Sequence, residues 1–324
     1  MQKKRGLVYL GILVILAVAV TVGIINRDWI YDFWRGMSYQ PAAEMEKIKG
    51  KLSLTDRGEF LFKASRPELN EREVFNEVCR EVLDKELAVL GCYAAGDIHI
   101  YNIQSKELDG ILELTTAHEL LHAVWARMNE GEKAALAGDL EKVYLENQKQ
   151  LEKELESYDD KQRQEELYVR SGTEIKNLPE SLEKHYAEIF KNQDMVVDYY
   201  NKYIAVFLAI EEEMEELKKE MDELRLRIDD LRNEYERRVI NLNSEIENFN
   251  SCAVEPGCFT DENAFNTKRS ELISEQGTLE EMYAQINTLI EQCNDLVERY
   301  NADVTRTEKL NRMMNSNMEV EEAE

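Results

Sequence analysis

The second half of the chain has a regular pattern of hydrophobic and polar positions. From Tyr203 onward, apolar residues recur at steps of three and four with charged residues between them, which is the seam of a coiled coil. Its first arm contains Met214, Leu217, Met221, Leu224, Ile228, Leu231 and Tyr235, and after a shift near Val239 it continues through Leu242, Ile246 and Phe249. Its second arm contains Leu272, Leu279, Met282, Ile286, Leu289, Cys293, Leu296 and Tyr300. The pattern predicts an antiparallel coiled-coil hairpin over residues 201–312, with a loop at 250–262.

The first half of the chain is less regular. Between residues 58 and 200, short strand-like runs are mixed with amphipathic helices, and the run from Gly96 to Ile103 alternates as a strand does. This favours a compact α+β domain, mostly helical, with a short sheet. Residues 31–57 are expected to form a juxtamembrane segment, and the polar, acidic residues 313–324 a disordered tail.

The N-terminal residues form a separate pattern. Three basic residues at positions 3–5 precede an uncharged run at 6–25, which as a helix is long enough to cross a bilayer core. We expect residues 1–30 to be a transmembrane anchor of a single-pass protein, with a cytoplasmic N-terminus and an extracytoplasmic bulk. At the far interface we expect an aromatic belt of Trp29, Tyr31 and Trp34. The alternative is a cleaved signal peptide, because residues 17–19 (Ala-Val-Ala) resemble a cleavage site.

Composition narrows the possible fold and partners. The 324 residues include 66 acidic and 40 basic ones, and the net charge of −26 argues against nucleic acid and against a broad anionic membrane surface as partners. With only 14 Gly and 4 Pro, the chain has too few turns for a β-sandwich or a propeller.

The cysteines suggest two local disulfides. Cys79 and Cys92 flank a short segment, and Cys252 and Cys258 bracket a Pro-Gly loop, so two pairs are natural in an oxidising compartment, although four free thiols fit the same spacings. Cys293 is left over, on the seam of the hairpin, where we expect it to be a buried filler. The spacings do not fit a structural zinc knuckle.

One short motif carries chemistry. Residues 115–124 read TTAHELLHAV, so His118 and His122 are four residues apart and face the same way on a helix, where both can bind one zinc ion (Zn2+). Glu119 lies beside the remaining coordination position, where it can take a proton from an attacking water. This HExxH motif and its uncharged flanks resemble the extended signature of the zincin metallopeptidases. The alternative is an amphipathic helix with merely structural histidines.

The resemblance also bears on the third zinc ligand. A metzincin has Gly and His where this chain has Trp125 and Met128, so that branch does not fit. Glu166 is expected on a second helix, with the small side chain of Val169 about one turn later. This arrangement resembles the way gluzincins present their third ligand. We therefore rank Glu166 first.

Other third ligands stay open. Glu174 is the second candidate, because Gly172 is expected to end its helix and leave Glu174 on a turn near the metal. Whichever of Glu166 and Glu174 is not a ligand is expected to orient a histidine. Glu141 and His185 are weaker alternatives. The run at 172–190 also resembles the sequence that follows HExxH in uncharacterised bacterial membrane-anchored zincins.

Together these observations predict a membrane-anchored, extracytoplasmic zinc metallopeptidase that hydrolyses a peptide or protein substrate, with Glu119 as general base. In zincins the strand before the metal-binding helix is commonly the sheet edge that pairs with the substrate, which implies that role for residues 98–103. Four side chains are candidates for stabilising the oxyanion: Tyr168, Arg170, His185 and Tyr186. The alternative is an extracytoplasmic coiled-coil scaffold with a non-catalytic zincin-like domain. The hairpin is expected to be a spacer or a docking arm, and its loop, with Phe259, is a possible site for a protein partner.

Overall fold

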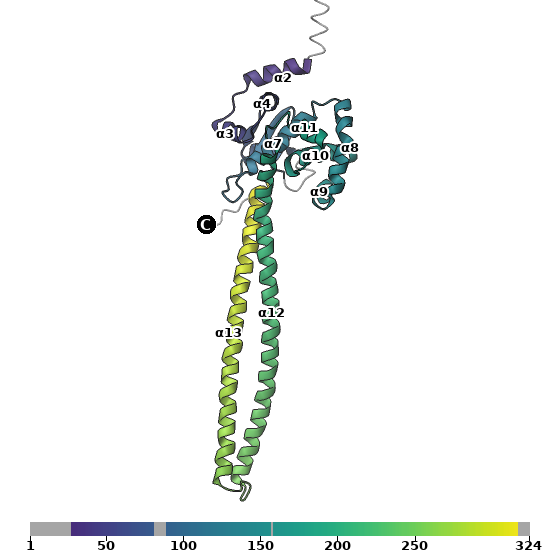
Figure 1. Cartoon of the computed structure of the whole chain (residues 1–324). Helices are drawn as coiled ribbons and strands as arrows, with labels where there is room; N and C mark the ends of the chain where they lie inside the picture. Colours follow the sequence, from purple (N-terminus) through teal and green to yellow (C-terminus); the bar gives the residue numbers. More distant parts are fainter. Residues whose placement is uncertain (1–26, 81–88, 157, 317–324) are drawn as a thin grey trace, which may run out of the picture. The chain divides into compact units, whose positions relative to one another are not determined.

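The computed structural model describes residues 27–80, 89–156 and 158–316 (Figure 1). The chain divides into two compact units, one formed by the residues up to Val206 together with those from Leu310 onward, and the other by Phe207–Lys309. The fold of the described residues is mostly helical, with one small sheet and one long pair of helices, which confirms the coarse prediction of the fold class.

The elements of the first unit follow one another closely along the chain. Its helices are α2 (Arg27–Ser38), α3 (Ala43–Lys51), α4 (Asp56–Ala64), α5 (Arg72–Val78), α7 (Ile111–Trp125), α8 (Glu130–Glu146), α9 (Gln148–Leu155), α10 (Asp160–Glu174) and α11 (Glu180–Tyr186). Its strands are β1 (Glu68–Asn70), β2 (Gly91–Ala94) and β3 (Asp97–Tyr101). The first residues of α12 (Gln193–Val254) and the last residues of α13 (Glu262–Met314) also belong to this unit.

The sheet has the order β1-β3-β2, with β1 parallel and β2 antiparallel to β3. The strand expected at the sheet edge, residues 98–103, is therefore central. The prediction was wrong because β1 pairs with β3, with Leu69 opposite Ile100. Strand β1 has only three residues, too few for an alternating apolar and polar pattern that would reveal a strand in the sequence. The edge strand that packs against α7 is β2.

Helix α7, which carries the HExxH motif, is the centre of the first unit. Twelve of its 15 residues are buried, which is typical of a helix surrounded by other elements. It packs against β2 and β3, and also against α3, α4 and α10. It begins at Gly110, whose φ of 93° is a left-handed conformation that glycine adopts without steric cost. The HExxH motif thus lies on a helix that is enclosed by other elements of the first unit.

Helix α10 approaches α7 closely because of a glycine. A Cβ atom on Gly172 would lie 2.5 Å from Cδ1 of Leu121, the residue before His122, and 2.6 Å from Cε1 of Tyr186. The sequence predicted that Gly172 ends the helix, but α10 continues through Glu174. The glycine serves close helix packing instead of termination, so Glu174 lies on the helix and not on a turn that folds back.

The segment from 31 to 57, expected to link the anchor to the domain, contributes to the core. Met45, Ile48 and Leu52 recur on one face of α3 and its C-cap and are almost fully buried with the residues of α7. The apolar spacing of three and four residues accounts for this burial.

No helix among the described residues is both long enough and apolar enough to cross a bilayer. The predicted single-pass membrane protein is therefore contradicted. The run at 6–25 on which that prediction rested lies outside the described residues. The helix that follows it, α2, has only 12 residues and carries Asp28, Asp32 and Arg35. The three aromatic residues expected in a belt, Trp29, Tyr31 and Trp34, are exposed on this helix.

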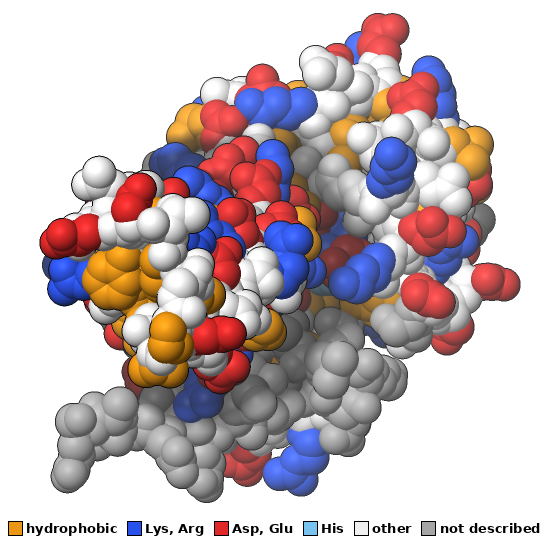
Figure 2. Space-filling view, turned by 90° about the horizontal axis from the view of Figure 1, so that it is seen from below, with side chains coloured by type: hydrophobic (Ala, Val, Ile, Leu, Met, Phe, Trp, Pro, Cys, Tyr) orange, Lys and Arg blue, Asp and Glu red, His pale blue; other side chains and the backbone are white. Residues whose placement is uncertain are grey.

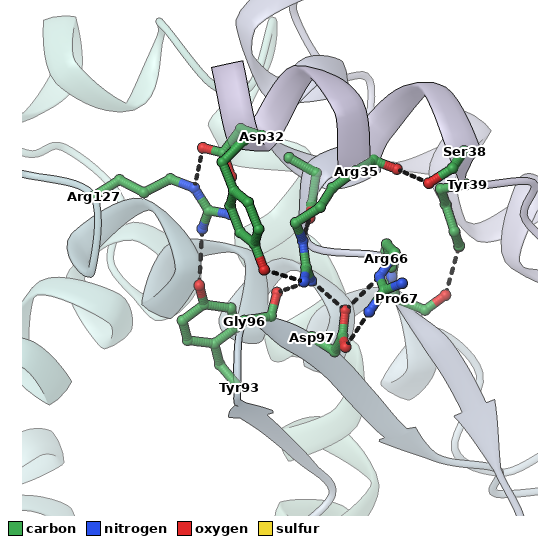
Figure 3. Close-up of polar contacts among 12 residues, drawn as sticks. Asp32, Arg35, Ser38, Tyr39, Arg66, Pro67, Tyr93, Gly96, Asp97 and Arg127 are labelled. Carbon is green, nitrogen blue, oxygen red and sulfur yellow. Dashed lines mark hydrogen bonds and ion pairs between the residues drawn. The ribbon is translucent and has the colours of Figure 1, made fainter. Parts of the chain in front are cut away.

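A cluster of ion pairs ties α2 to β2, β3 and the end of α7 (Figure 3). Arg127, just after α7, binds both carboxylate oxygens of Asp32 at 2.8 and 2.9 Å and donates to the hydroxyl of Tyr93 on β2 at 3.0 Å. Arg35 donates to the carbonyl of Gly96 at 2.8 Å, and Arg35 and Arg66 both bind Asp97 at the start of β3. Bidentate arginine pairs are geometrically demanding, so this cluster fixes β2 relative to α7.

Two disulfides form as predicted. Cys79, after α5, is bonded to Cys92 on β2, and Cys252 is bonded to Cys258 at the end of the hairpin. Among the described residues, Cys293 is the free cysteine, and it is partly exposed. The first disulfide gives β2 a second attachment besides its pairing with β3.

The second unit is the predicted helical hairpin, with α12 and α13 side by side (Figure 1). Leu242, Leu272, Leu279 and Met282 are buried in its seam, and Arg238 binds both oxygens of Glu275 across it at 2.7 Å. Helix α12 begins at Gln193 and continues to Val254, so the connection is shorter than the predicted loop at 250–262.

The C-terminal end of α13 is ordered where a disordered tail was expected from residue 313. Met314 and Ser316 are buried. Residues 317–324 lie outside the described residues. On the face shown in Figure 2, acidic and basic side chains are interspersed, so the excess negative charge does not form a single-sign patch there.

Candidate metal centre

The two motif histidines and Glu166 come together in the first unit. Nε2 of His118 and Nε2 of His122 are 3.3 Å apart. The carboxylate of Glu166, from α10, places Oε1 3.6 Å from Nε2 of His118 and Oε2 3.4 Å from Nε2 of His122. Among the described residues, this is the group of His, Cys, Asp and Glu side chains whose geometry could hold a metal ion.

The 3.3 Å spacing of the two Nε2 atoms matches an edge of a tetrahedral zinc site. Two atoms bound to one zinc ion at about 2.0–2.1 Å lie roughly 3.3–3.4 Å apart when the angle at the metal is tetrahedral. Two imidazole nitrogens and one carboxylate, with a fourth position left for a small molecule, form the donor set of catalytic zinc sites. The three side chains therefore fit a zinc ion.

The residue before Glu166 orients one of the histidines. Oε1 of Glu165 lies 2.9 Å from Nδ1 of His122, and since a carboxylate accepts, Nδ1 carries the hydrogen; Nε2, which faces His118 and Glu166, is the nitrogen that can bind a metal ion once it is deprotonated. The sequence suggested that Glu174 would take this role. Which of two neighbouring glutamates faces a given histidine depends on the rotation of α10, which the apolar pattern alone does not fix.

The electrostatics of the group favour a bound cation. Burial lowers the pKa of His118 to about 3, so its imidazole is neutral. Burial also opposes the ionisation of Glu166, but the neighbouring His118 and His122 outweigh it and lower the pKa of the carboxyl group. For His122, burial is outweighed by hydrogen bonds to Glu165 and Glu166, which raise its pKa. A pair of histidines that must share one proton beside a carboxylate is a natural place for a metal ion to replace that proton.

Arg170 lies behind Glu166. Its Nε is 2.8 Å from Oε1 of Glu166, and its Nη1 donates to Oε1 of Glu174 at 2.9 Å. Glu174 is thus held by an arginine and is outside the metal-binding group, although burial raises its pKa to about 7. The weaker candidates are also outside it, because Glu141 is exposed on α8 and His185 binds the hydroxyl of Tyr168 at 2.9 Å.

The metal-binding group opens into a cleft of about 840 Å³. Glu119 lines this cleft beside the histidines and is only 5% exposed. The edge strand passes directly over it, because a Cβ atom on Gly91 would lie 2.7 Å from Cγ of Glu119. A glycine is therefore required for β2 to come this close to the motif.

Most of the predicted oxyanion stabilisers lie elsewhere. Tyr168 and Tyr186 are fully buried in the core beside Trp125, with His185 next to them. Arg170 lines the cleft, but its guanidinium is already bound to carboxylates. The tyrosines that do line the cleft are Tyr93, Tyr158, Tyr200 and Tyr203. Two of these, Tyr200 and Tyr203, come from the start of α12, where no sequence pattern indicates residues of a cleft.

Comparison of this chain with protein-family models, with curated proteins and with solved structures finds no match.

Proposed function

We propose that this chain is a zinc-dependent metallopeptidase with a gluzincin-like set of ligands, His118, His122 and Glu166. The observation that carries the proposal is that the two Nε2 atoms lie 3.3 Å apart and both face the carboxylate of Glu166, so that one ligand atom from each residue lies within 4.8 Å of the others. When bound, zinc supplies a Lewis acid that polarises the peptide carbonyl and the attacking water.

Glu119 is the general base in this proposal. It lines the cleft together with both histidines and is almost fully buried. Its carboxylate takes a proton from the attacking water and later gives a proton to the leaving amine. The presence of a carboxylate at this point favours an enzyme over a scaffold with a non-catalytic domain, since a purely structural site does not need the base.

The edge strand β2 is the substrate-binding element in this proposal, in place of residues 98–103. It lines the cleft through Gly91, Cys92 and Tyr93. Within the described residues it has one partner strand, β3. An extended peptide pairing with it gains backbone hydrogen bonds that do not depend on the peptide sequence.

The test compares two buried glutamates of the same helix. Glu119→Gln keeps the shape of the side chain but removes its ability to accept a proton, so we expect peptide hydrolysis to fall by about 100- to 10,000-fold with zinc still bound. Glu113→Gln is the matched control, since Glu113 is also buried on α7 but binds Lys51, away from the cleft. Zinc content by elemental analysis and cleavage of a peptide mixture by mass spectrometry give both readouts. Equal hydrolysis by Glu119→Gln and the parent would remove Glu119 from the reaction.

A further inference from the structure

The cleft changes in chemical character along α7. His118 and His122 lie in the second half of this helix, and Leu114 and Ile111 line the same cleft four and seven residues before His118. At 1.5 Å per residue, these apolar side chains lie about 6 and 10 Å from His118 along the helix axis. An extended peptide advances about 3.3–3.6 Å per residue, so this separation corresponds to about two or three residues of a bound substrate.

The start of α12 forms another wall of this apolar part. Tyr199 packs against Gly110 at the N-terminus of α7, where a Cβ atom on the glycine would lie 2.7 Å from Cδ1 of the tyrosine. Helix α12 therefore crosses the beginning of α7, and about one turn further along Ile204 lines the cleft. Val89 and Leu90, just before and at the start of the edge strand, line it as well.

The end of α13 supplies a further side chain. Met314 lines the cleft although it is almost 200 residues away from the HExxH motif in sequence. Its position is fixed from both sides, because Leu310 and Ser316 are each only 1% exposed. Nδ2 of Asn76 on α5 also donates to the carbonyl of Ser316 at 2.8 Å. The residue is thus held as part of the cleft wall.

From this arrangement we infer that the cleft contains a subsite for one apolar side chain of a peptide substrate, with Met314 as its specificity-determining residue. The Met314 subsite is formed by Val89, Leu90, Ile111, Leu114, Ile204 and Met314. All six are uncharged, and the charged residues that line the cleft, such as Lys153, Glu154, Glu165 and Arg170, are not among them. The unbranched, polarisable side chain of Met adapts to apolar groups of different shape. The inference rests on the proposed peptidase function.

The subsite makes a measurable difference between substrates. A hydrophobic pocket distinguishes side chains that differ by one methylene by about 10- to 200-fold. We therefore expect cleavage sites flanked by Leu, Ile, Met or Phe to be favoured at least tenfold over sites flanked by Asp or Glu. Met314→Glu places a carboxylate in the pocket, so we expect cleavage at apolar sites to fall by about tenfold or more.

The experiment uses the zinc-loaded full-length chain and a matched pair of variants. Met314→Glu is compared with Met313→Glu, the neighbouring methionine, which does not line the cleft. Cleavage sites in a random decapeptide mixture are mapped by mass spectrometry, and zinc affinity and thermal melting show whether each variant keeps its fold. We expect only Met314→Glu to lose the apolar preference, with zinc affinity unchanged in both. If the parent chain hydrolyses peptides without an apolar preference, or if it has this preference and both variants keep it, the subsite is refuted.

A binding measurement separates this inference from the proposed function. The zinc-loaded Glu119→Gln variant, alone and combined with Met314→Glu, is titrated with two nonapeptides that differ only in a central Leu-Leu or Asp-Asp pair. If the Leu-Leu peptide binds more tightly than the Asp-Asp peptide, and Met314→Glu removes this difference, the subsite is supported. This holds even if the parent chain hydrolyses no peptide, because the absence of hydrolysis would refute only the peptidase function. Equal binding of the two peptides overturns the subsite.

Discussion

Gly91→Ala tests how closely the edge strand must lie over the general base. The added Cβ would be 2.7 Å from Cγ of Glu119 and 2.7 Å from Cγ2 of Thr115. Carbon atoms in van der Waals contact are about 3.5–4.0 Å apart, so something must move by about 1 Å. Strand β2 is held by the disulfide at Cys92 and by the hydrogen bond from Arg127 to Tyr93, so we expect the side chain of Glu119 to give way.

The size of the effect follows from this displacement. Overpacking a tight contact costs about 1–3 kcal/mol of folding free energy. A misplacement of about 1 Å in a catalytic group lowers the rate by roughly 100-fold. The three atoms nearest to the new methyl group belong to Glu119 and Thr115, and neither residue is a proposed zinc ligand. We therefore expect peptide hydrolysis to fall by about 100-fold, with zinc affinity within about threefold of the parent value and a moderate loss of stability.

Gly138→Ala is the matched control, since a Cβ at Gly138 on α8 meets nothing within 4 Å. It should leave hydrolysis unchanged and raise stability by about 0.5–1 kcal/mol, because alanine favours the helix. Peptide turnover, zinc dissociation constants and urea unfolding are measured for both variants. If Gly91→Ala hydrolyses peptides within about threefold of the parent rate, the edge strand does not constrain Glu119 and the reasoning fails.

Three further predictions concern the ligands, the pH dependence and the hairpin. Glu166→Ala should abolish tight zinc binding, whereas Glu165→Ala should weaken it by only about 10- to 100-fold, as measured in one metal buffer at one pH; the reverse order would contradict the ligand assignment. Burial raises the pKa of Glu174 from 4.5 to about 7, so the free energy of unfolding of the zinc-free parent should fall as the pH rises from 4.5 to 7. In zinc-free Glu174→Gln this fall should be smaller, because the amide does not ionise. Equal pH dependence of the two unfolding free energies would contradict the prediction. Reduction of Cys252–Cys258 should speed hydrogen exchange in the connecting loop without unfolding the hairpin, whose seam buries its own apolar residues; loss of helical circular dichroism on reduction would refute this.

The sequence predicted those features that depend on spacing within one element. His118 and His122 lie on the same face of a helix because they are four residues apart. The seam of the hairpin was predicted in the same way, from apolar residues three and four positions apart. The short separations of the cysteine pairs likewise predicted both disulfides. The choice of Glu166 over Glu174 needed the family resemblance as well, and the structure brings Glu166 to the two histidines.

The features that the sequence did not predict depend on contacts between distant elements. A glycine after a helical run commonly marks the C-terminal end of the helix, which is why the sequence predicted an end at Gly172. In the structure Gly172 instead allows α10 to lie close to Leu121. The central position of β3 depends on pairing with β1, which is only three residues long. Met314 reaches the cleft only because the end of α13 returns to the first unit, and no local pattern encodes such a return.

The adjacent carboxylates of α10 have a consequence for how the fold assembles. Glu165 and Glu166 bind opposite nitrogens of the same imidazole, His122, so sliding α10 by one residue along α7 would break both contacts together. A cation held between the two helices would act as a cross-link between residues more than 40 positions apart in the chain. At a free concentration 100 times its dissociation constant, such an ion adds about 2.7 kcal/mol to the stability of the folded state. Removing the metal should therefore lower the melting temperature of the first unit as well as stop its chemistry, much as cutting a disulfide would.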